Sequence, residues 1–340
     1  MTIIGSNTSV IVIHDGRKGH LNPSLAVAEI IQEKYSLGFQ AFQLPITLSK
    51  KWVSLFKKFS NFPIFYKFLG QLFFKVEPTG IQQTEIIICS GMPNLIYAAY
   101  LAQKYQIPLL YVGNLRKFNE NLIDLSITAL AQNVNCKQII LPTPPVCAHF
   151  ATQLKAQEQH EAVLLLGGST SDYPFSKQDY SDMIQEFAHF VSVHQLKGSV
   201  ICSRRTPDLD PKSLDLLHTQ QIDHIDPHQK FTMSEKLAQC KYIFVTEDSI
   251  TMLSEAIHTG AIVTSVCLNE AKTDELIEKY LNYQYIQRKS IAHLGQVVEH
   301  YSPIKRTDMV TPLVQQLDRL YFQGHFHKVT NSRKKNKAYA

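Results

Sequence analysis

Within six residues near the start of the chain, Asp15–His20 brings together a carboxylate, two cations, two glycines and an imidazole. A short apolar run precedes this cluster, and Asn22 and Pro23 are suited to cap and to open a helix after it. Such a combination at a helix N-terminus suits phosphate contact or proton transfer, although a solvated turn has the same composition. We assign to this phosphate loop the residues Gly16, Arg17, Lys18, Gly19 and Asn22.

A second cluster, Gly167–Thr170, follows an apolar run that opens the second half of the chain. Glycines allow the backbone to approach a bound group, and Ser169 and Thr170 offer hydroxyl and amide donors to phosphate oxygens. The pattern G-x-G-x-x-G is absent here and after the first apolar run, which argues against a dinucleotide-dependent dehydrogenase.

Two more clusters contain groups that bind anions. In the third, Cys202–Pro207, paired arginines can hold a diphosphate, and we expect Arg204 to be the one that does so. In the fourth, Thr246–Gly260, Asp248 or Ser249 is suited to cap a short helix that ends at Gly260.

The N-terminus of this fourth-cluster helix can hold a phosphate group. Glu255 lies about one turn inside the helix, on the side of Thr251 and Met252, where it can accept hydrogen bonds from a ribose diol. The apolar neighbours of Glu255 predict that it is buried rather than a surface residue.

Two further patterns resemble metal sites. Asp208 and Asp210 form a D-x-D sequence, but they follow a proline in a polar connection, which favours a solvated turn. A second group of carboxylates and imidazoles has the spacing of a loop that enters a helix; it comprises Asp223, His224, Asp226 and His228. We predict no metal site and no cofactor.

The elements that must position these clusters alternate between short apolar runs and longer helical patterns. Continuous apolar strands joined by helices predict an α/β fold with parallel sheets covered on both faces. The predicted strands are Val10–Ile13, Ile86–Cys89, Leu109–Val112, Ile139–Leu141, Val163–Leu166, Val200–Cys202, Ile243–Val245 and Ile262–Val266. Ligands of such sheets bind beyond the carboxyl ends of the strands, where all four clusters lie.

The 340 residues are enough for two domains, and a polar segment after three prolines places the boundary within 142–160. We predict two Rossmann-like domains that face each other across a cleft. Their ranges are 1–150 and 160–304, followed by a helical segment at 305–327 that returns to the first domain and a basic tail at 328–340.

Composition excludes several classes of protein. Hydrophobic residues make up 44% of the chain and charged residues 19%, as in globular proteins, and a net charge of +5 does not indicate a nucleic-acid partner. The six cysteines have no metal-ligand spacing, which indicates reduced thiols in the cytoplasm. We find neither a signal peptide nor a membrane-spanning run, so any membrane contact is expected to be peripheral.

One segment, 50–76, is rich in lysines and aromatic residues and contains no acidic residue. Its spacing predicts a helix with Trp52 and Phe59 on one face, ended by Pro63, and such a face can lie among lipid headgroups or pack on the sheet. The expected membrane contacts are Lys51, Trp52, Lys57, Lys58 and Phe59. A basic tail with Arg333, Lys334, Lys335 and Lys337 would add attraction to an anionic leaflet.

The motifs DGRKGH, LLLGGSTSDY, CSRRTP and VTEDSITMLSEAIHTG, in this order, resemble those of the bacterial relatives of plant proteins named for elongated mitochondria, the mitochondrial-fission ELM family. The resemblance covers the second domain well and the first mainly through its opening loop. It implies a GT-B glycosyltransferase fold, with the nucleotide-sugar donor on the second domain and the acceptor on the first.

From this resemblance we expect a glycosyltransferase that acts on a lipid-linked glycan, in lipooligosaccharide core or surface-polysaccharide assembly, at the cytoplasmic face of the inner membrane. Asp15 or His20 would be the catalytic base of an inverting enzyme, or both would bind substrate in a retaining one. The alternatives are a scaffold protein on the same fold and a nucleotide-sugar epimerase. The expected donor site comprises Gly167, Gly168, Ser169, Thr170, Ser203, Arg204, Arg205, Glu247, Asp248, Ser249, Thr251, Met252 and Glu255.

Overall fold

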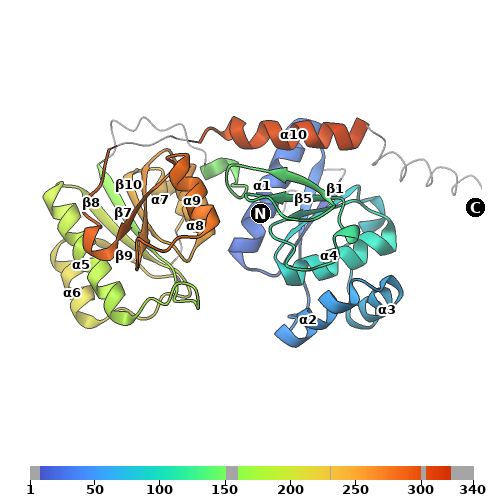
Figure 1. Cartoon of the computed structure of the whole chain (residues 1–340), viewed down its shortest axis with the longest axis horizontal. Helices are drawn as coiled ribbons and strands as arrows, with labels where there is room; N and C mark the ends of the chain where they lie inside the picture. Colours follow the sequence, from blue (N-terminus) through green and yellow to red (C-terminus); the bar gives the residue numbers. More distant parts are fainter. Residues whose placement is uncertain (1–7, 151–159, 230, 300–303, 323–340) are drawn as a thin grey trace, which may run out of the picture. The chain divides into compact units, whose positions relative to one another are not determined.

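A computed structural model describes residues 8–150, 160–229, 231–299 and 304–322. These residues form two compact units (Figure 1). The first unit contains the described chain up to Cys147 and the helix that follows Arg306, whereas the second runs from Ala148 to Arg306. The basic tail predicted at 328–340 lies outside the described residues.

The first unit is built on a six-stranded parallel sheet in the order β2-β1-β3-β4-β5-β6. Its central strands are apolar and buried, as expected for a sheet that helices cover on both faces. The strands are β1 (Thr8–His14), β2 (Gly38–Gln43), β3 (Ile86–Ser90), β4 (Leu109–Val112), β5 (Leu125–Thr128) and β6 (Lys137–Ile140).

Alternate residues of β1 enter two cores, because successive strand residues point to opposite faces. Val10 and Val12 pack with α1 (Lys18–Tyr35) and α10 (Arg306–Phe322). Ile11 and Ile13 belong to the core on the other face, which α4 (Met92–Tyr105) covers together with α2 (Lys50–Phe59) and α3 (Pro63–Phe73). Short 3-10 turns, η1 (Ile81–Gln83) and η2 (Glu120–Leu122), complete this unit.

The second unit repeats the plan with six parallel strands in the order β12-β11-β10-β7-β8-β9. The strands are β7 (Glu161–Leu166), β8 (Lys197–Cys202), β9 (Asp223–Ile225), β10 (Cys240–Thr246), β11 (Ile262–Cys267) and β12 (Gln287–Ser290). The helices are α5 (Lys177–Val193), α6 (Pro211–Thr219), α7 (Met233–Leu237), α8 (Ile250–Ile257) and α9 (Glu275–Asn282), with 3-10 turns η3 (Ala148–Phe150) and η5 (Ile291–His293). Phe187 and Phe190 of α5 pack on Phe244 of β10 in its core.

All eight predicted strands are present, and the predicted α/β class with parallel sheets is confirmed. Four strands were not predicted. Three of them, β2, β9 and β12, are sheet edges whose residues are half-buried or exposed, so they lack a continuous apolar run. The fourth, β5, is buried but only four residues long. The loop expected at Asp223 to His228 is therefore partly wrong, because β9 occupies its start.

The first helix does not begin where its sequence indicated. Asn22 and Pro23 were expected at its start, but α1 begins at Lys18, with Arg17 in the N-cap position, and Pro23 lies inside it. Burial of the inner face of α1, from Ser24 to Ile31, prevails over the one backbone hydrogen bond that a proline removes. No described helix is long and apolar enough to span a bilayer.

Candidate functional site

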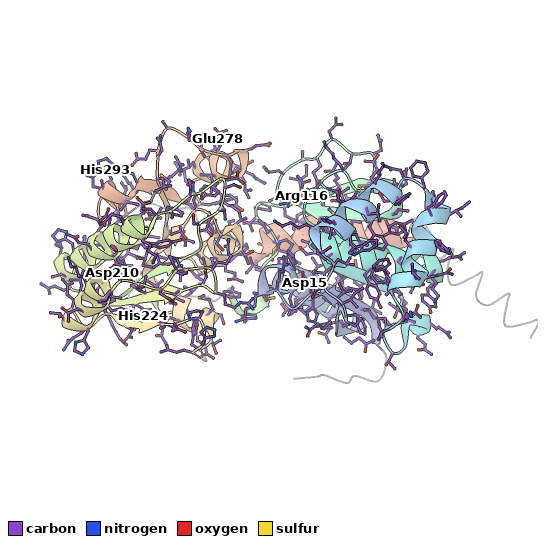
Figure 2. All side chains as sticks on the ribbon, turned by 90° about the horizontal axis from the view of Figure 1, so that it is seen from below. Asp15, Arg116, Asp210, His224, Glu278 and His293 are labelled. Carbon is purple, nitrogen blue, oxygen red and sulfur yellow. The ribbon has the colours of Figure 1, made fainter. Side chains whose placement is uncertain are left out.

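The first candidate site lies at the switch point of the first sheet, where β1 has β2 as its neighbour on one side and β3 on the other. Ligands of doubly wound sheets bind at such points, beyond the carboxyl ends of the strands. His20 Nδ1 lies 3.1 Å and 3.0 Å from the two carboxylate oxygens of Asp15, which is labelled in Figure 2. The contact favours the tautomer with a proton on Nδ1, so His20 Nε2 is left to accept a proton. Nε2 has no hydrogen-bond partner within the described chain.

Gly91, which follows β3, is the residue against which the His20 ring packs. A Cβ atom at this position would lie 2.4 Å from His20 Nδ1, and the backbone φ of +83° is one that only glycine adopts readily. Sequence reasoning missed Gly91, although its place directly after a predicted strand was a usable signal. The loop after β3 therefore fixes the position of the imidazole.

The predicted phosphate loop is shorter than expected. Gly16 has a φ of +82°, and Arg17 Nε lies 3.6 Å from Asp15 while its side chain remains 65% exposed. Lys18, Gly19 and Asn22 are not in a loop, because they form the first turns of α1. The backbone of those turns is still at the carboxyl edge of the sheet, and Arg17 and Lys18 are exposed there.

The second candidate site lies at the switch point of the second sheet, between β7 and β10. Asp248, after β10, connects the loops that follow three strands. Its side chain is fully buried and accepts hydrogen bonds from the Gly168 N–H at 2.9 Å, the Thr246 hydroxyl at 2.8 Å and the Arg205 guanidinium at 2.8 Å. The expected capping role is wrong for Asp248, because Ser249 occupies the N-cap position of α8, and neither side chain makes a capping hydrogen bond.

The two glycines after β7 allow the loops after β8 and β10 to pack closely against the loop after β7. A Cβ atom on Gly167 would lie 2.0 Å from an Asp248 carboxylate oxygen, and one on Gly168 would lie 2.3 Å from Arg205 Cβ. Their amides donate to Thr246 Oγ1 and to Asp248, and the Thr170 amide donates to the Tyr173 carbonyl. Of the four amides in this cluster, that of Ser169 has no partner in the described structure and can bind an anion.

Thr206, which sequence reasoning did not single out, holds the loop after β8. Its hydroxyl donates to backbone oxygens of Leu166 and Gly167, both at 2.8 Å, and accepts from the Ser203 amide at 2.8 Å. Ser203 in turn accepts from the Arg205 amide. This cluster is therefore tied to the end of β7 and presents its two arginines at the carboxyl edge.

The two arginines have different surroundings. Arg205 pairs with Asp248, whereas the Arg204 side chain is exposed and has no polar partner among the described residues. The first amides of α8, beginning at Ile250, have no acceptor inside the helix, as at every helix N-terminus. Arg204, the Ser169 amide and the start of α8 are thus the available anion donors at this switch point.

Glu255 is buried, as its apolar neighbours indicated, with 6% of its surface exposed. Thr251 and Met252, one turn earlier on α8, are half-exposed. The structure therefore keeps the carboxylate inside the unit and the two earlier residues at the surface. The predicted contact of Glu255 with a ribose stays a prediction.

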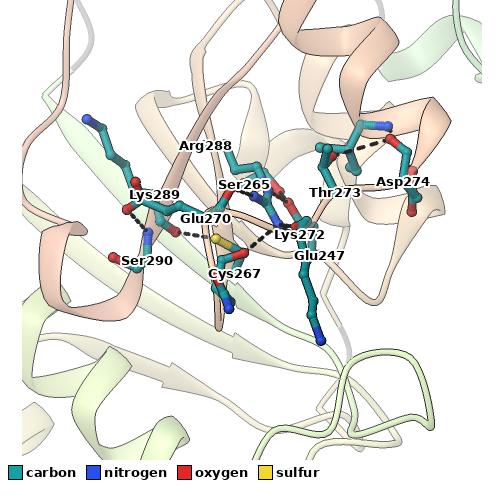
Figure 3. A network of polar contacts seen from close by, with 12 residues as sticks. Glu247, Ser265, Cys267, Glu270, Lys272, Thr273, Asp274, Arg288, Lys289 and Ser290 are labelled. Carbon is teal, nitrogen blue, oxygen red and sulfur yellow. Dashed lines mark hydrogen bonds and ion pairs between the residues drawn. The ribbon is translucent and has the colours of Figure 1, made fainter.

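Glu247 differs from its neighbours in the predicted site because an unpredicted residue, Arg288 of β12, holds its carboxylate (Figure 3). Arg288 Nε and Nη2 donate to the two Glu247 oxygens at 2.5 Å and 2.9 Å, and Ser265 donates to one of them at 2.9 Å. Both charged side chains are nearly buried, at 1% exposed for Glu247 and 7% for Arg288. The Glu247 carboxylate therefore holds Arg288 in position, and its predicted contact with the donor stays a prediction.

Arg288 also fixes the loop that follows β11. Its guanidinium donates to the backbone carbonyls of Asn269, Glu270 and Lys272 (Figure 3). Asp274, at the end of this loop, accepts a 2.6 Å hydrogen bond from the Tyr173 hydroxyl of the loop after β7. One buried guanidinium therefore orders the loop that follows β11. Arg288 was not predicted because it lies in a short polar edge strand that gives no apolar signal.

The D-x-D pattern has a structural role in α6. Asp210 is the N-cap residue and accepts from the amides of Lys212 and Ser213, and its other oxygen accepts from the Ser181 and Ser213 hydroxyls at 2.6 Å (Figure 2). These bonds, led by that from Ser181, hold the pKa of the carboxyl well below its usual range. The aspartate expected in a solvated turn is therefore a helix cap.

His224 of β9, also labelled in Figure 2, lies with Nε2 3.6 Å from Cys202 Sγ, a pair that could suggest a thiolate nucleophile. Burial raises the pKa of Cys202 to about 12, so its thiol stays protonated near neutral pH. The pair therefore has no nucleophile to offer. All six cysteines are free thiols.

The aromatic face predicted for α2 is a packing face. Phe56 is fully buried against Tyr66 and Phe73 of α3, and Trp52 meets Phe73 at 4.4 Å between ring centroids. Phe59 is half-buried. The predicted helix and its end before Pro63 are confirmed. α3 covers Phe56, and the lipid contacts predicted for other α2 residues stay predictions.

The sequence profile of the family described as mitochondrial fission ELM1 matches residues 146–317, which include the whole second unit. A comparison with curated proteins gives no significant match.

Solved structures share the fold along nearly the whole chain. A Listeria monocytogenes protein for which UDP-N-acetylglucosamine 2-epimerase activity has been suggested is similar with a TM-score of 0.55 at 11% identity, over 95% of this chain and 98% of that one. A UDP-N-acetylglucosamine 2-epimerase has a TM-score of 0.54 at 12% identity, over 94% and 97%. The calicheamicin glycosyltransferase CalG4 has a TM-score of 0.48 at 10% identity, over 98% and 99%. The predicted GT-B class of fold is confirmed, and at these identities the likeness concerns the fold alone.

Proposed function

The chain belongs to the mitochondrial fission ELM1 family, and we propose that it is a glycosyltransferase that moves a sugar from a nucleotide-sugar donor to a lipid-linked glycan. Glycosyl transfer or sugar-nucleotide binding fits its fold, because solved structures of this fold include UDP-sugar epimerases and a glycosyltransferase. The observation that carries the proposal is the exposed, unpartnered Arg204 side chain at the carboxyl edge of the second sheet, in a loop that Arg205 joins to Asp248 just before α8.

In the proposed donor site the pyrophosphate binds at this switch point. Arg204, the Ser169 amide and hydroxyl, and the first amides of α8 supply positive charge and hydrogen-bond donors. Asp248 and the two glycines after β7 hold the loops that carry these groups in place before a ligand binds. Such preorganised donors stabilise the negative charge that develops on a departing nucleotide. Donor groups of this kind support transfer without a metal ion or cofactor.

Glu255, Thr251 and Met252 of α8 would contact the nucleoside. The side chains of Thr251 and Met252 are half-exposed on the first two turns, and the buried Glu255 carboxylate lies one turn further along. A carboxylate accepts hydrogen bonds from both hydroxyls of a ribose. On this proposal the donor is a ribonucleotide.

In the first unit, His20 would act as the general base. The contact with Asp15 orients the imidazole, as in other carboxylate–histidine pairs. His20 Nε2 would take the proton of the acceptor hydroxyl while the oxygen attacks the anomeric carbon and the nucleotide leaves. Arg17 and Lys18, both exposed at the same edge, are suited to an anionic acceptor.

The finer assignment, an acceptor of the lipooligosaccharide core or a surface polysaccharide at the cytoplasmic face of the inner membrane, comes from the family resemblance. It is supported by the basic, aromatic segment 50–76 of the first unit. A lipid-linked acceptor diffuses in the membrane plane, so a peripheral enzyme would meet it there.

A nucleotide-binding experiment tests the donor site. Calorimetry with UDP, GDP, dTDP and CMP should give binding to at least one nucleotide, and the Arg204→Ala variant should lose most of it. Lys212→Ala, an exposed cation on α6, is the matched control and should bind as the wild type does. Absence of binding to every nucleotide would favour the scaffold alternative, whereas donor turnover without any acceptor would favour an epimerase.

A further inference from the structure

Half of the large hydrophobic side chains exposed in the described chain lie within one stretch of 25 residues. They belong to α2, α3 and the residues that flank α3, and they are Trp52, Phe62, Ile64, Phe65, Phe68, Leu72 and Val76. The other exposed residues of this kind are spread along the chain from Ile140 to Val298. Scattered exposed hydrophobic residues are ordinary, but a contiguous group of this size marks an interaction surface.

The exposed residues form a stripe along α3, which we call the α3 stripe: Ile64, Phe65, Phe68 and Leu72. At about 100° per residue these four positions fall within a sector of about 100° around the helix axis. They are 83%, 60%, 63% and 59% exposed, respectively. An amphipathic helix normally turns such a stripe toward the core, and α3 turns it toward solvent.

The opposite side of α3 already packs on the first unit. Tyr66 is fully buried and donates a hydrogen bond to the Ile96 carbonyl of α4, and Gly70 is so close to Tyr100 that a Cβ atom would lie 2.1 Å from the ring. The two faces of α3 are therefore fixed in place. The α3 stripe cannot turn inward without breaking the core that holds the helix.

Charges around the stripe are of one sign. Within 50–76 there are six lysines and no aspartate or glutamate, and Lys51, Lys58, Lys67 and Lys75 are exposed. An anionic lipid surface complements both features, because it offers negative headgroups to the lysines and an apolar boundary to the stripe.

We propose that the α3 stripe inserts into the headgroup region of an anionic membrane and that the flanking lysines hold the phosphates around it. This inference rests on the proposed function only for the reason why the protein would bind a membrane, namely to reach a lipid-linked acceptor. It replaces the α2 face as the lipid-contacting surface, because the α2 aromatic residues pack against α3.

Vesicle cosedimentation of the full chain tests the docking surface directly. Wild-type protein should sediment with vesicles of phosphatidylcholine and phosphatidylglycerol and much less with phosphatidylcholine alone. Phe65→Ser combined with Phe68→Ser should weaken binding by about tenfold or more, because two apolar anchors are lost. Ile140→Ser combined with Val193→Ser, two equally exposed apolar positions outside α3, is the matched control and should bind as the wild type does.

The depth of insertion can be measured separately, because Trp52 is the only tryptophan. In a Trp52→Phe background, Phe68→Trp should be quenched by brominated lipid in anionic vesicles, and Val193→Trp should not. Circular dichroism and thermal unfolding of each variant check that it is folded.

Three results would overturn the proposal: no sedimentation of the wild type under any condition, equal binding by the Phe65/Phe68 variant and the wild type, or no quenching at position 68. A fourth such result would come from sedimentation velocity: a wild-type dimer that the Phe65/Phe68 substitutions convert to a monomer. That result would assign the stripe to contact with a second copy of the chain. Nucleotide binding is measured on the same samples. Vesicle binding without nucleotide binding would refute the proposed function alone, and the reverse would refute the membrane surface alone.

Discussion

The guanidinium of Arg205 lies 2.8 Å from the fully buried carboxylate of Asp248, although the two residues are 43 positions apart. This pair joins the loop after β8 to the loop after β10, and Gly168 joins both through its amide and its close approach to Arg205. The neighbouring Arg204 has no such partner in the described structure. Adjacent arginines therefore have separable roles.

Arg205→Ala should destabilise the protein by about 1 to 3 kcal/mol, because it leaves a buried carboxylate with neutral donors only. Arg204→Ala should change the free energy of unfolding by less than about 0.5 kcal/mol, as is usual for an exposed residue without partners. Urea unfolding followed by circular dichroism measures both. Equal stability of the two variants would mean that the Asp248 contact contributes nothing.

The same two variants should behave in the opposite way toward nucleotide. Arg204→Ala should weaken binding by about 1.5 to 3 kcal/mol if Arg204 makes a charge-assisted phosphate bond. Calorimetry on a nucleotide that the wild type binds gives the dissociation constants. An unchanged constant for Arg204→Ala would remove this residue from the donor site.

Gly91→Ala should impair turnover more than it impairs donor binding. The new methyl group would displace the His20 ring, and the backbone at φ +83° would be strained by about 1 to 3 kcal/mol. Gly295→Ala is the control, because nothing lies within 4 Å of its Cβ position. Steady-state kinetics with both variants decide the matter, and wild-type turnover in Gly91→Ala would show that the imidazole position is unimportant.

His20→Gln and Asp15→Asn should each lower turnover by a factor of about 100 or more while the dissociation constant of the nucleotide stays the same. Asp15→Asn keeps the shape of the side chain but removes the charge that orients and stabilises the imidazole. If both variants kept full turnover, the general base would have to be sought elsewhere in the chain.

Arg288→Ala should cost about 3 to 5 kcal/mol of stability, because it leaves Glu247 charged and nearly buried without its cation. Combining it with Glu247→Gln should restore part of the loss, since the uncompensated charge is then absent. Lys289→Ala, the next residue along β12, is the matched control and should have little effect. Denaturant unfolding measures these three variants and Glu247→Gln alone. A loss in the double variant equal to the sum of the two single losses would indicate that the pair is not coupled.

The sequence predicted the sheet cores, because buried parallel strands are continuous apolar runs. It also predicted that the four polar clusters follow the carboxyl ends of strands. It did not predict β9 or β12, which are polar edge strands stabilised by pairing with a neighbour. It also misplaced the start of α1, where burial prevails over the helix signal of Pro23.

Contacts between distant segments account for the rest. Glu247 was predicted as a ligand contact, and in the structure it pairs with Arg288, 41 positions away. No local sequence pattern predicts a pair between residues so far apart. The glycines after β7 were predicted to make room for a ligand, and they make room for Asp248 and Arg205. In both cases the residue type indicated a close contact, but the sequence did not indicate which residue would make that contact.

Sugar transfer is the measurement that tests the central claim most directly. Purified protein would be incubated with UDP-, GDP-, dTDP- and CMP-sugars labelled in the sugar, together with membranes from cells that lack the protein. The account predicts that at least one donor transfers its label to a lipid-extractable glycan with release of the free nucleotide, and that Arg204→Ala and His20→Gln largely abolish this transfer. No incorporation from any donor, or conversion of a donor to its epimer without acceptor, would contradict it.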